Sequence, residues 1–173
     1  MIDAGQYALL LRFRDLVTEP GGNIAEHRQI IRQRGYAWWG WWARQREKVP
    51  RNVLERLFPS EAIKREILLF DSGMMRLYRT SGSKVVVAPS HLGVNSPDFE
   101  ATPEYYVRGR YPAWFRLEED ISIIEASSIT IAGRPTIQGE PDDLLPVAGD
   151  HTVSLEKLSD EGPTLWVAIP PGR

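Results

Sequence analysis

The sequence of 173 residues contains no cysteine and only three histidines. The absence of thiols excludes disulfide bonds, cysteine nucleophiles and cysteine-ligated zinc, and it favours an intracellular protein. His27, His91 and His151 are far apart in the sequence and belong to no HxH or HExxH pattern. A metal site would therefore have to be assembled by the fold from distant residues. We expect no metal.

Long apolar runs and glycine-rich phosphate loops are also missing. No run of about 18 apolar residues occurs that could span a membrane as a helix. The first residues, MIDAGQYALLLRFRDL, lack the small-residue cleavage site of a signal peptide. Neither GxGxxG nor GxxxxGK followed by Ser or Thr occurs. We expect a cytoplasmic protein with no membrane association and no bound cofactor.

Charge is distributed unevenly, although the formal net charge is only −2. Residues 26–56 contain eight Lys and Arg against three Asp and Glu, whereas residues 117–173 contain three against eleven. Hydrophobic residues make up 42% of the chain, and its length suits one folded core. We expect a single domain over residues 1–173, with a core of about residues 7–125 and an acidic C-terminal extension of residues 126–173.

Several short segments alternate between apolar and polar residues, which indicates strands. In residues 7–14 the alternation places Arg12 and Arg14 on an outer face. YAWWGWW, residues 36–42, favours a strand because aromatic side chains suit a pleated surface and Gly40 disfavours a helix. Further strands are predicted in ILLF, MMRLYRT, KVVVAPS, YYVRGRYPAWFRL, ISIIE and TLWVAIP, with a Ser-Gly hairpin turn joining MMRLYRT to KVVVAPS. HLGVNSPDFEATPEY is predicted to be a surface loop, and AGRPTIQGEPDDLLPVAGD is turn-rich and acidic.

Two helices are predicted in the first third of the chain. The first covers residues 24–34, with Asn23 and Glu26 as a capping box and Gly35 as its end. The second lies near residues 50–58. Because helices are missing between most later strands, a doubly wound parallel fold is excluded. The sequence predicts an α+β fold: a small, mostly antiparallel open β-barrel or curled sheet with two to three helices at its ends.

Aromatic residues and arginines are interleaved in YAWWGWWARQR and YYVRGRYPAWFR. Bases stack on aromatic rings for about 1–3 kcal/mol each, and guanidinium groups bind phosphates. This mixture favours a nucleotide or unpaired bases over a duplex. Alternation separates Tyr36, Trp38 and Trp42 from Trp39 and Trp41, so one face packs on the core. Filling of the core is the alternative interpretation for each tryptophan.

Gly109 lies between Arg108 and Arg110 and permits a bulge or a close approach of the backbone. A bulge would turn both guanidinium groups to the same side, where together they would suit a phosphate. The alternative is an exposed strand edge that is protected by charge.

The order of a strand, a capped helix with a histidine, GYAWWGWW and YYVRGRYPAWFRL resembles the PUA-like superfamily, particularly its EVE and ASCH branches, over about residues 7–125. The resemblance implies a small barrel whose aromatic-walled pocket accepts a nucleobase, often modified and flipped. It also implies that the clustered tryptophans form pocket walls, with arginines and a further tryptophan opposite. The candidate ligand-binding residues are aromatic or arginine side chains of the two segments: Tyr36, Trp38, Trp39, Trp41, Trp42, Tyr106, Arg108, Arg110 and Trp114.

We therefore expect a non-catalytic domain that binds a nucleotide, a modified nucleobase or a short single-stranded nucleic acid. The acidic C-terminal segment favours a small ligand or a short strand over a duplex. Two alternatives stay open. The aromatic residues could face a protein partner in a multi-component bacterial system, or a small hydrolase or nucleotide-modifying enzyme could use His91 or His27 as its acid or base. Ser90 and His91 are poor partners for each other, because adjacent residues of a strand point to opposite faces.

Overall fold

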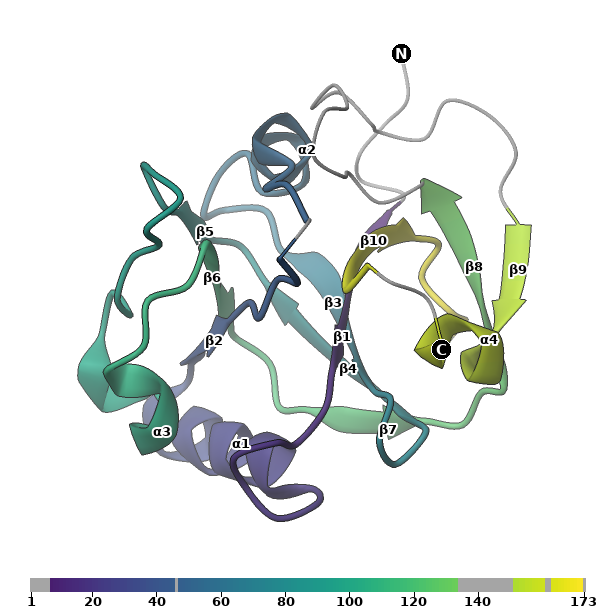
Figure 1. Ribbon diagram of the computed structural model, residues 1–173, viewed down its shortest axis with the longest axis horizontal. Helices are drawn as coiled ribbons and strands as arrows, with labels where there is room; N and C mark the ends of the chain where they lie inside the picture. Colours follow the sequence, from purple (N-terminus) through teal and green to yellow (C-terminus); the bar gives the residue numbers. More distant parts are fainter. Residues whose placement is uncertain (1–6, 46, 134–150, 161–162, 173) are drawn as a thin grey trace.

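The computed structural model describes residues 7–45, 47–133, 151–160 and 163–172 (Figure 1). Within these ranges the strands form two sheets, one in the order β7-β4-β3-β1-β10-β8-β9 and a smaller one in the order β2-β6-β5. The strands are β1 (Ala8–Phe13), β2 (Ala37–Gly40), β3 (Arg65–Asp71), β4 (Arg76–Gly82), β5 (Val85–Val87), β6 (Ala113–Leu117), β7 (Ser122–Ile124), β8 (Ser128–Gly133), β9 (His151–Ser154) and β10 (Leu165–Ala168).

The described helices are α1 (Gly22–Arg34), α2 (Arg51–Leu57), α3 (Glu104–Val107), α4 (Leu155–Ser159) and the short 3-10 helix η2 (Phe99–Ala101). The larger sheet is curled into a half-barrel, and its strands pair antiparallel except for β1 and β3 (Figure 1). The predicted α+β fold with a curled, mostly antiparallel sheet is confirmed. In the described part of the chain, no helix combines the length and apolar character needed to cross a membrane.

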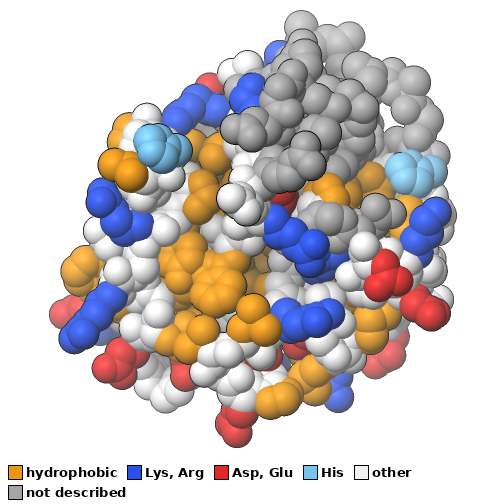
Figure 2. All heavy atoms as spheres, viewed as in Figure 1, with side chains coloured by type: hydrophobic (Ala, Val, Ile, Leu, Met, Phe, Trp, Pro, Cys, Tyr) orange, Lys and Arg blue, Asp and Glu red, His pale blue; other side chains and the backbone are white. Residues whose placement is uncertain are grey.

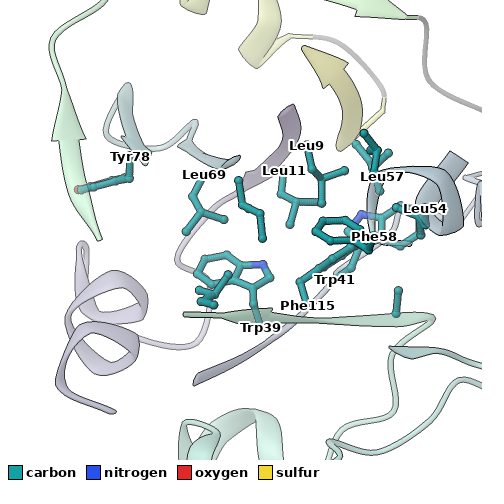
Figure 3. Packing of buried hydrophobic residues seen from close by; sticks show 14 of the residues in the cluster. Leu9, Leu11, Trp39, Trp41, Leu54, Leu57, Phe58, Leu69, Tyr78 and Phe115 are labelled. Atoms are coloured by element: carbon teal, nitrogen blue, oxygen red, sulfur yellow. The ribbon is translucent and has the colours of Figure 1, made fainter. Parts of the chain in front are cut away.

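The main core lies between the two sheets. Figure 3 shows Trp39 and Phe115 of the smaller sheet directed toward Leu11 and Leu69 of the larger one. Trp39 pairs with Phe115 across β2 and β6, so the two rings occupy the same face. Burial of these large side chains removes apolar surface from water and supplies most of the stabilisation that positions the strands.

The larger sheet is covered on both faces, so the half-buried first strand predicted from the sequence is wrong. Leu10 belongs to a second core on the far side of β1, together with Leu158 of α4 and Trp166 of β10. Arg12 is only 5% exposed, and its Nη1 donates to the carbonyl oxygens of Leu158 at 3.0 Å and Ser159 at 3.1 Å. The C-terminal segment therefore covers the face on which the alternation had placed this arginine.

The segment expected to be an acidic extension supplies three strands of the larger sheet. β10 lies between β1 and β8, and β9 forms the edge. The division at about residue 125 thus does not follow the sheet, because β1 obtains one of its two neighbours from the end of the chain. Most of the predicted turn-rich segment, residues 134–150, lies outside the described residues.

The first helix ends where the sequence predicted, but its N-terminus is capped differently from the prediction. Gly35 terminates α1 with φ 88°, and its N–H donates to the carbonyl oxygen of Ile31. At the other end Gly21 is the N-cap with φ 84°, and no side chain caps the helix. Asn23 lies inside the first turn, where its side chain bonds to two tyrosines. The predicted capping box of Asn23 and Glu26 is therefore wrong, whereas α2 is confirmed.

β4 and β5 do not form the predicted hairpin. β4 pairs with β3 and β7, whereas β5 pairs with β6 in the smaller sheet. The chain changes sheets at Gly82, where a Cβ atom would lie 2.0 Å from the carbonyl oxygen of Arg116. The tight turn lies instead between β3 and β4, and Met75 adopts φ 54° there. Part of the predicted strand YYVRGRYPAWFRL is also wrong, because residues 104–107 form α3.

Candidate functional site

A pocket of about 570 Å³ opens where the end of β1, the segment after β2 and the region of α3 meet. Figure 2 shows hydrophobic side chains gathered in the middle of the face viewed, beside the position of β2 in Figure 1. Residues from five separate parts of the chain line the pocket: Leu11, Arg12, Phe13, Arg14, Asp15, Leu16, Val17, Thr18, Asn23, Trp39, Gly40, Trp41, Trp42, Ala43, Arg44, Ser72, Tyr105, Tyr106, Arg110, Tyr111, Pro112 and Thr164.

Three aromatic rings form two walls of the pocket at right angles. Trp42 and Tyr111 are stacked, with 6.1 Å between ring centroids and 17° between planes. Tyr106 presents its ring at a steep angle to both, at 88° to Trp42 and 78° to Tyr111. Trp42 is 38% exposed whereas Tyr106 is buried, so Trp42 supplies the accessible aromatic surface.

Two glycines make room for the ring of Tyr111. A Cβ atom on Gly109 would lie 2.6 Å from Cε2 of Tyr111, and one on Gly40 would lie 2.9 Å from its Cδ2. Heavy atoms of neighbouring residues do not approach so closely without displacement. The absence of a side chain at these two positions therefore permits the placement of Tyr111. The close approach that Gly109 permits is made by this ring, and Gly109 lies between α3 and β6 and not in a strand bulge.

A buried amide fixes the tyrosines beside the pocket. The side-chain Nδ2 of Asn23 donates to the hydroxyl of Tyr106 at 3.1 Å, and the hydroxyl of Tyr105 donates to Oδ1 of Asn23. Burial is the main cause that raises the pKa of Tyr105, Tyr106 and Tyr111 above the usual value. The three hydroxyl groups therefore stay protonated and neutral at physiological pH.

A second polar network joins the wall that follows β2 to the C-terminal part of the chain. The indole N–H of Trp41 donates to Oγ1 of Thr164 at 2.9 Å. Thr164 in turn donates to Glu47 through Oγ1 at 2.6 Å and through its backbone N–H at 2.8 Å. Glu47 also accepts from the backbone N–H of Arg44 at 2.7 Å. Glu47 thereby holds the segment that carries Trp42 and Arg44 against Thr164.

Three exposed arginines, Arg14, Arg44 and Arg110, line the same pocket. Among the described residues, none of their guanidinium groups takes part in a hydrogen bond or ion pair. Asp15 is the single acidic residue in the described lining, and its Oδ2 already accepts from the N–H of Gly21 at 2.7 Å. Three positive charges around one opening outnumber the single carboxylate of Asp15, so they raise the local potential and attract anions. The rim of this aromatic pocket is therefore electropositive.

Of the nine candidate residues, five line the pocket: Trp39, Trp41, Trp42, Tyr106 and Arg110. The structure places the other four elsewhere. Trp38 and Trp114 are buried together on the opposite face of the smaller sheet, and the indole N–H of Trp114 donates to the carbonyl oxygen of Val94 at 2.8 Å.

The last two candidates lie at the surface away from the pocket. The hydroxyl of Tyr36 donates to Asp98 at 2.6 Å, and the guanidinium carbon of Arg116 lies 4.2 Å from the centroid of the Tyr36 ring. Arg108 is exposed at the end of α3 and does not line the pocket. The predicted pairing of Arg108 with Arg110 toward one ligand is therefore not seen.

Sequence reasoning missed several pocket residues, among them Arg14, Arg44, Tyr105 and Tyr111. Arg14 follows the first strand, and its position in the alternation indicated only an outer face. Tyr111 stands inside the aromatic and arginine segment YYVRGRYPAWFR, so composition alone could have suggested it. No local pattern connects these positions, because contacts between distant segments bring them together.

The two candidate histidines lie outside the pocket. His27 is completely buried between α1 and β2, with Nδ1 2.8 Å from the carbonyl oxygen of Asn23 and Nε2 3.2 Å from that of Trp38. Burial lowers the pKa of His27 to about 4, so it is neutral at physiological pH. His91 is exposed and is not among the lining residues.

The curled, mostly antiparallel sheet with its helices has the architecture of a PUA-like domain, a class of RNA- or nucleotide-binding type. The family model described as Pua-like matches residues 9–169, and the chain belongs to this family. The match confirms the resemblance seen in the sequence and extends it from β1 to the residue after β10. No curated protein and no solved structure matches the chain.

Proposed function

We propose that this chain is a non-catalytic recognition domain that binds a nucleotide, a modified nucleobase or a short single-stranded nucleic acid. The observation that carries the proposal is the convergence of three aromatic rings and three exposed guanidinium groups on one pocket. Belonging to a family of nucleotide-binding type supports it.

The aromatic walls suit a flat base. Trp42 offers an accessible ring face, and Tyr106 closes the adjacent side at 88°. One base stacked on such a ring gains about 1–3 kcal/mol. A volume of about 570 Å³ lies within the range of small-molecule sites, so base, ribose and phosphate fit together.

The arginines suit the phosphate of the same ligand. A guanidinium group donates up to two parallel hydrogen bonds to phosphate oxygens, and bonds between charged groups are about twice as strong as neutral ones. Arg14, Arg44 and Arg110 come from three segments around the opening. A phosphate at the rim would therefore meet donors from more than one side.

Two observations favour this function over the alternatives. Trp38, Trp39, Trp41, Trp114 and Trp166 are buried, which leaves Trp42 alone and not a tryptophan patch for a protein partner. His27 is enclosed in the core, where a substrate in the pocket has no contact with either ring nitrogen. Both observations support a binding pocket over a protein-docking surface or an acid–base site.

The proposal is tested by titrating the protein with nucleosides, nucleoside monophosphates and single-stranded oligonucleotides while tryptophan fluorescence is recorded. We expect saturable quenching, because a stacked base changes the surroundings of Trp42. Affinity for phosphate-bearing ligands should fall as salt increases, since phosphate contacts are screened. A signal that stays flat for every ligand would contradict the proposed function.

A further inference from the structure

A second hollow adjoins the pocket and has the opposite charge. This groove, of about 650 Å³, shares Val17, Thr18 and Tyr105 with the pocket. Its remaining lining residues are Glu19, Gly22, Ala25, Glu26 and Glu104. Three carboxylates and no Lys or Arg stand among its described lining residues, whereas the pocket has the buried Arg12 and the exposed Arg14, Arg44 and Arg110 beside Asp15.

Two of the carboxylates of the groove, those of Glu26 and Glu104, are close enough to interact. The pKa of Glu26 is raised, first by burial and second by the negative charge of Glu104. Glu19, Glu26 and Glu104 are exposed and form no ion pair with a described residue. The described residues include no group of three acidic or histidine side chains placed to hold a metal ion. The groove therefore presents uncompensated negative charge.

We infer that the pocket selects a free nucleotide that carries its own phosphate, in preference to a nucleotide within a strand. This inference rests on the proposed function. A nucleotide within a strand has a phosphate on each side, so a second phosphate must also be accommodated near the opening of the pocket. A strand that passes Thr18 and Tyr105 brings its next phosphate against Glu19, Glu26 and Glu104. That phosphate is repelled, whereas a single phosphate at the arginines is attracted.

Calorimetric titration compares three probes with the same base: the nucleoside, its 5′-monophosphate and the 5′-phosphorylated dinucleotide. All four common bases are used, and the base that binds most tightly is compared across the probes. We expect the monophosphate to bind about tenfold more tightly than the nucleoside, because a charged hydrogen bond contributes about 1.5–3 kcal/mol. The dinucleotide should bind about tenfold more weakly than the monophosphate, because its second phosphate meets the groove.

Variants that remove negative charge from the groove test whether the groove causes the weaker binding of the dinucleotide. In the double variant Glu26→Gln and Glu104→Gln, the ratio of the affinity for the monophosphate to that for the dinucleotide should fall about threefold or more. The affinity for the monophosphate itself should stay nearly constant. Glu55→Gln is the matched control, since Glu55 is also exposed on a helix and does not line either hollow. Higher salt should lower the ratio of the affinity for the monophosphate to that for the dinucleotide, because screening weakens the repulsion between the carboxylates and the second phosphate.

The outcomes separate this inference from the proposed function. The inference that the pocket selects free nucleotides would be overturned if the dinucleotide bound as tightly as the monophosphate. It would also be overturned if the ratio of the two affinities were unchanged in the double variant. Either result would leave the proposed nucleotide binding intact. The absence of binding by every probe would overturn this inference and also the proposed binding of unmodified nucleotides. Preserved folding of each variant is checked by its thermal unfolding curve, so a loss of structure is not mistaken for a loss of affinity.

Discussion

The ring of Trp42 lies 17° from parallel to the ring of Tyr111, although the two residues are 69 positions apart in the sequence. Trp42 follows the end of β2, and Tyr111 precedes the start of β6. β2 and β6 pair antiparallel with Gly40 opposite Trp114, which brings the two rings to the same end of the smaller sheet. The pairing of these strands thus creates the aromatic corner of the pocket.

Replacing Trp42 by alanine should weaken nucleotide binding about tenfold to a hundredfold, because a stacked base contributes about 1–3 kcal/mol. Phe99→Ala is the control, since Phe99 is also an exposed aromatic residue and does not line the pocket. Calorimetric titration with the tightest-binding monophosphate measures both. Equal affinities for the two variants would show that the base does not stack on Trp42.

Arg110 and Arg108 offer a matched pair on one segment. Both are exposed, but only Arg110 lines the pocket. Arg110→Ala should lower the affinity for a monophosphate about tenfold and reduce its dependence on salt, because one charged hydrogen bond is lost. Arg108→Ala should leave both quantities nearly unchanged. If both variants lose affinity equally, the phosphate lies outside the pocket and is held by general surface charge.

Gly109→Ala tests the placement of Tyr111. The added methyl group would lie 2.6 Å from the ring, so the ring must move. We expect a loss of affinity of about fivefold, since one aromatic contact contributes about 0.5–1.5 kcal/mol. The free energy of unfolding should also fall, because the displaced ring packs against Tyr106 and Trp114. Gly172→Ala, with no neighbouring atom within 4 Å, is the control. Unchanged affinity in Gly109→Ala would mean that the position of Tyr111 is unimportant for binding.

His27 should make the stability of the fold depend on pH. Its pKa is lowered from 6.5 to about 4 in the folded protein, so the unfolded chain binds the extra proton between these values. The contribution of neutral His27 to the free energy of unfolding is fully present above pH 6.5 and is lost as the pH falls toward 4. Between pH 7 and pH 5 the free energy of unfolding should fall by about 2 kcal/mol for this reason. Urea unfolding of the protein and of His27→Gln at both pH values measures this difference. An identical pH dependence in the variant would exclude His27 as its source.

The sequence predicted features that depend on neighbouring residues. The helix predicted over residues 24–34 is present as α1, Gly22–Arg34, and Gly35 ends it as expected. Trp38 and Trp39 also fall on opposite faces of β2, as alternation requires. The predicted separation continues beyond the end of β2, because Trp41 lies in the main core with Trp39, whereas Trp42 contacts Tyr106, which belongs to the cluster of Trp38. The exposure of Trp42 followed from no local rule.

Features that depend on distant segments could not be predicted in this way. Arg12 has the position of an outer residue, yet residues near Leu158 cover it. Asn23 has the composition of a helix cap, yet two tyrosines more than 80 positions away bind its side chain. In both cases a tertiary hydrogen bond replaces the local structure that the residue type favours.

The contacts of Glu47 with Thr164 also determine when the pocket can exist. During synthesis on a ribosome, the segment that carries Trp42 and Arg44 emerges long before its anchor. Until Thr164 has left the exit tunnel, that segment lacks its hydrogen-bond partner, and β1 lacks β10. The pocket that we propose to bind a nucleotide is therefore completed only after translation has passed Thr164, 117 residues beyond Glu47.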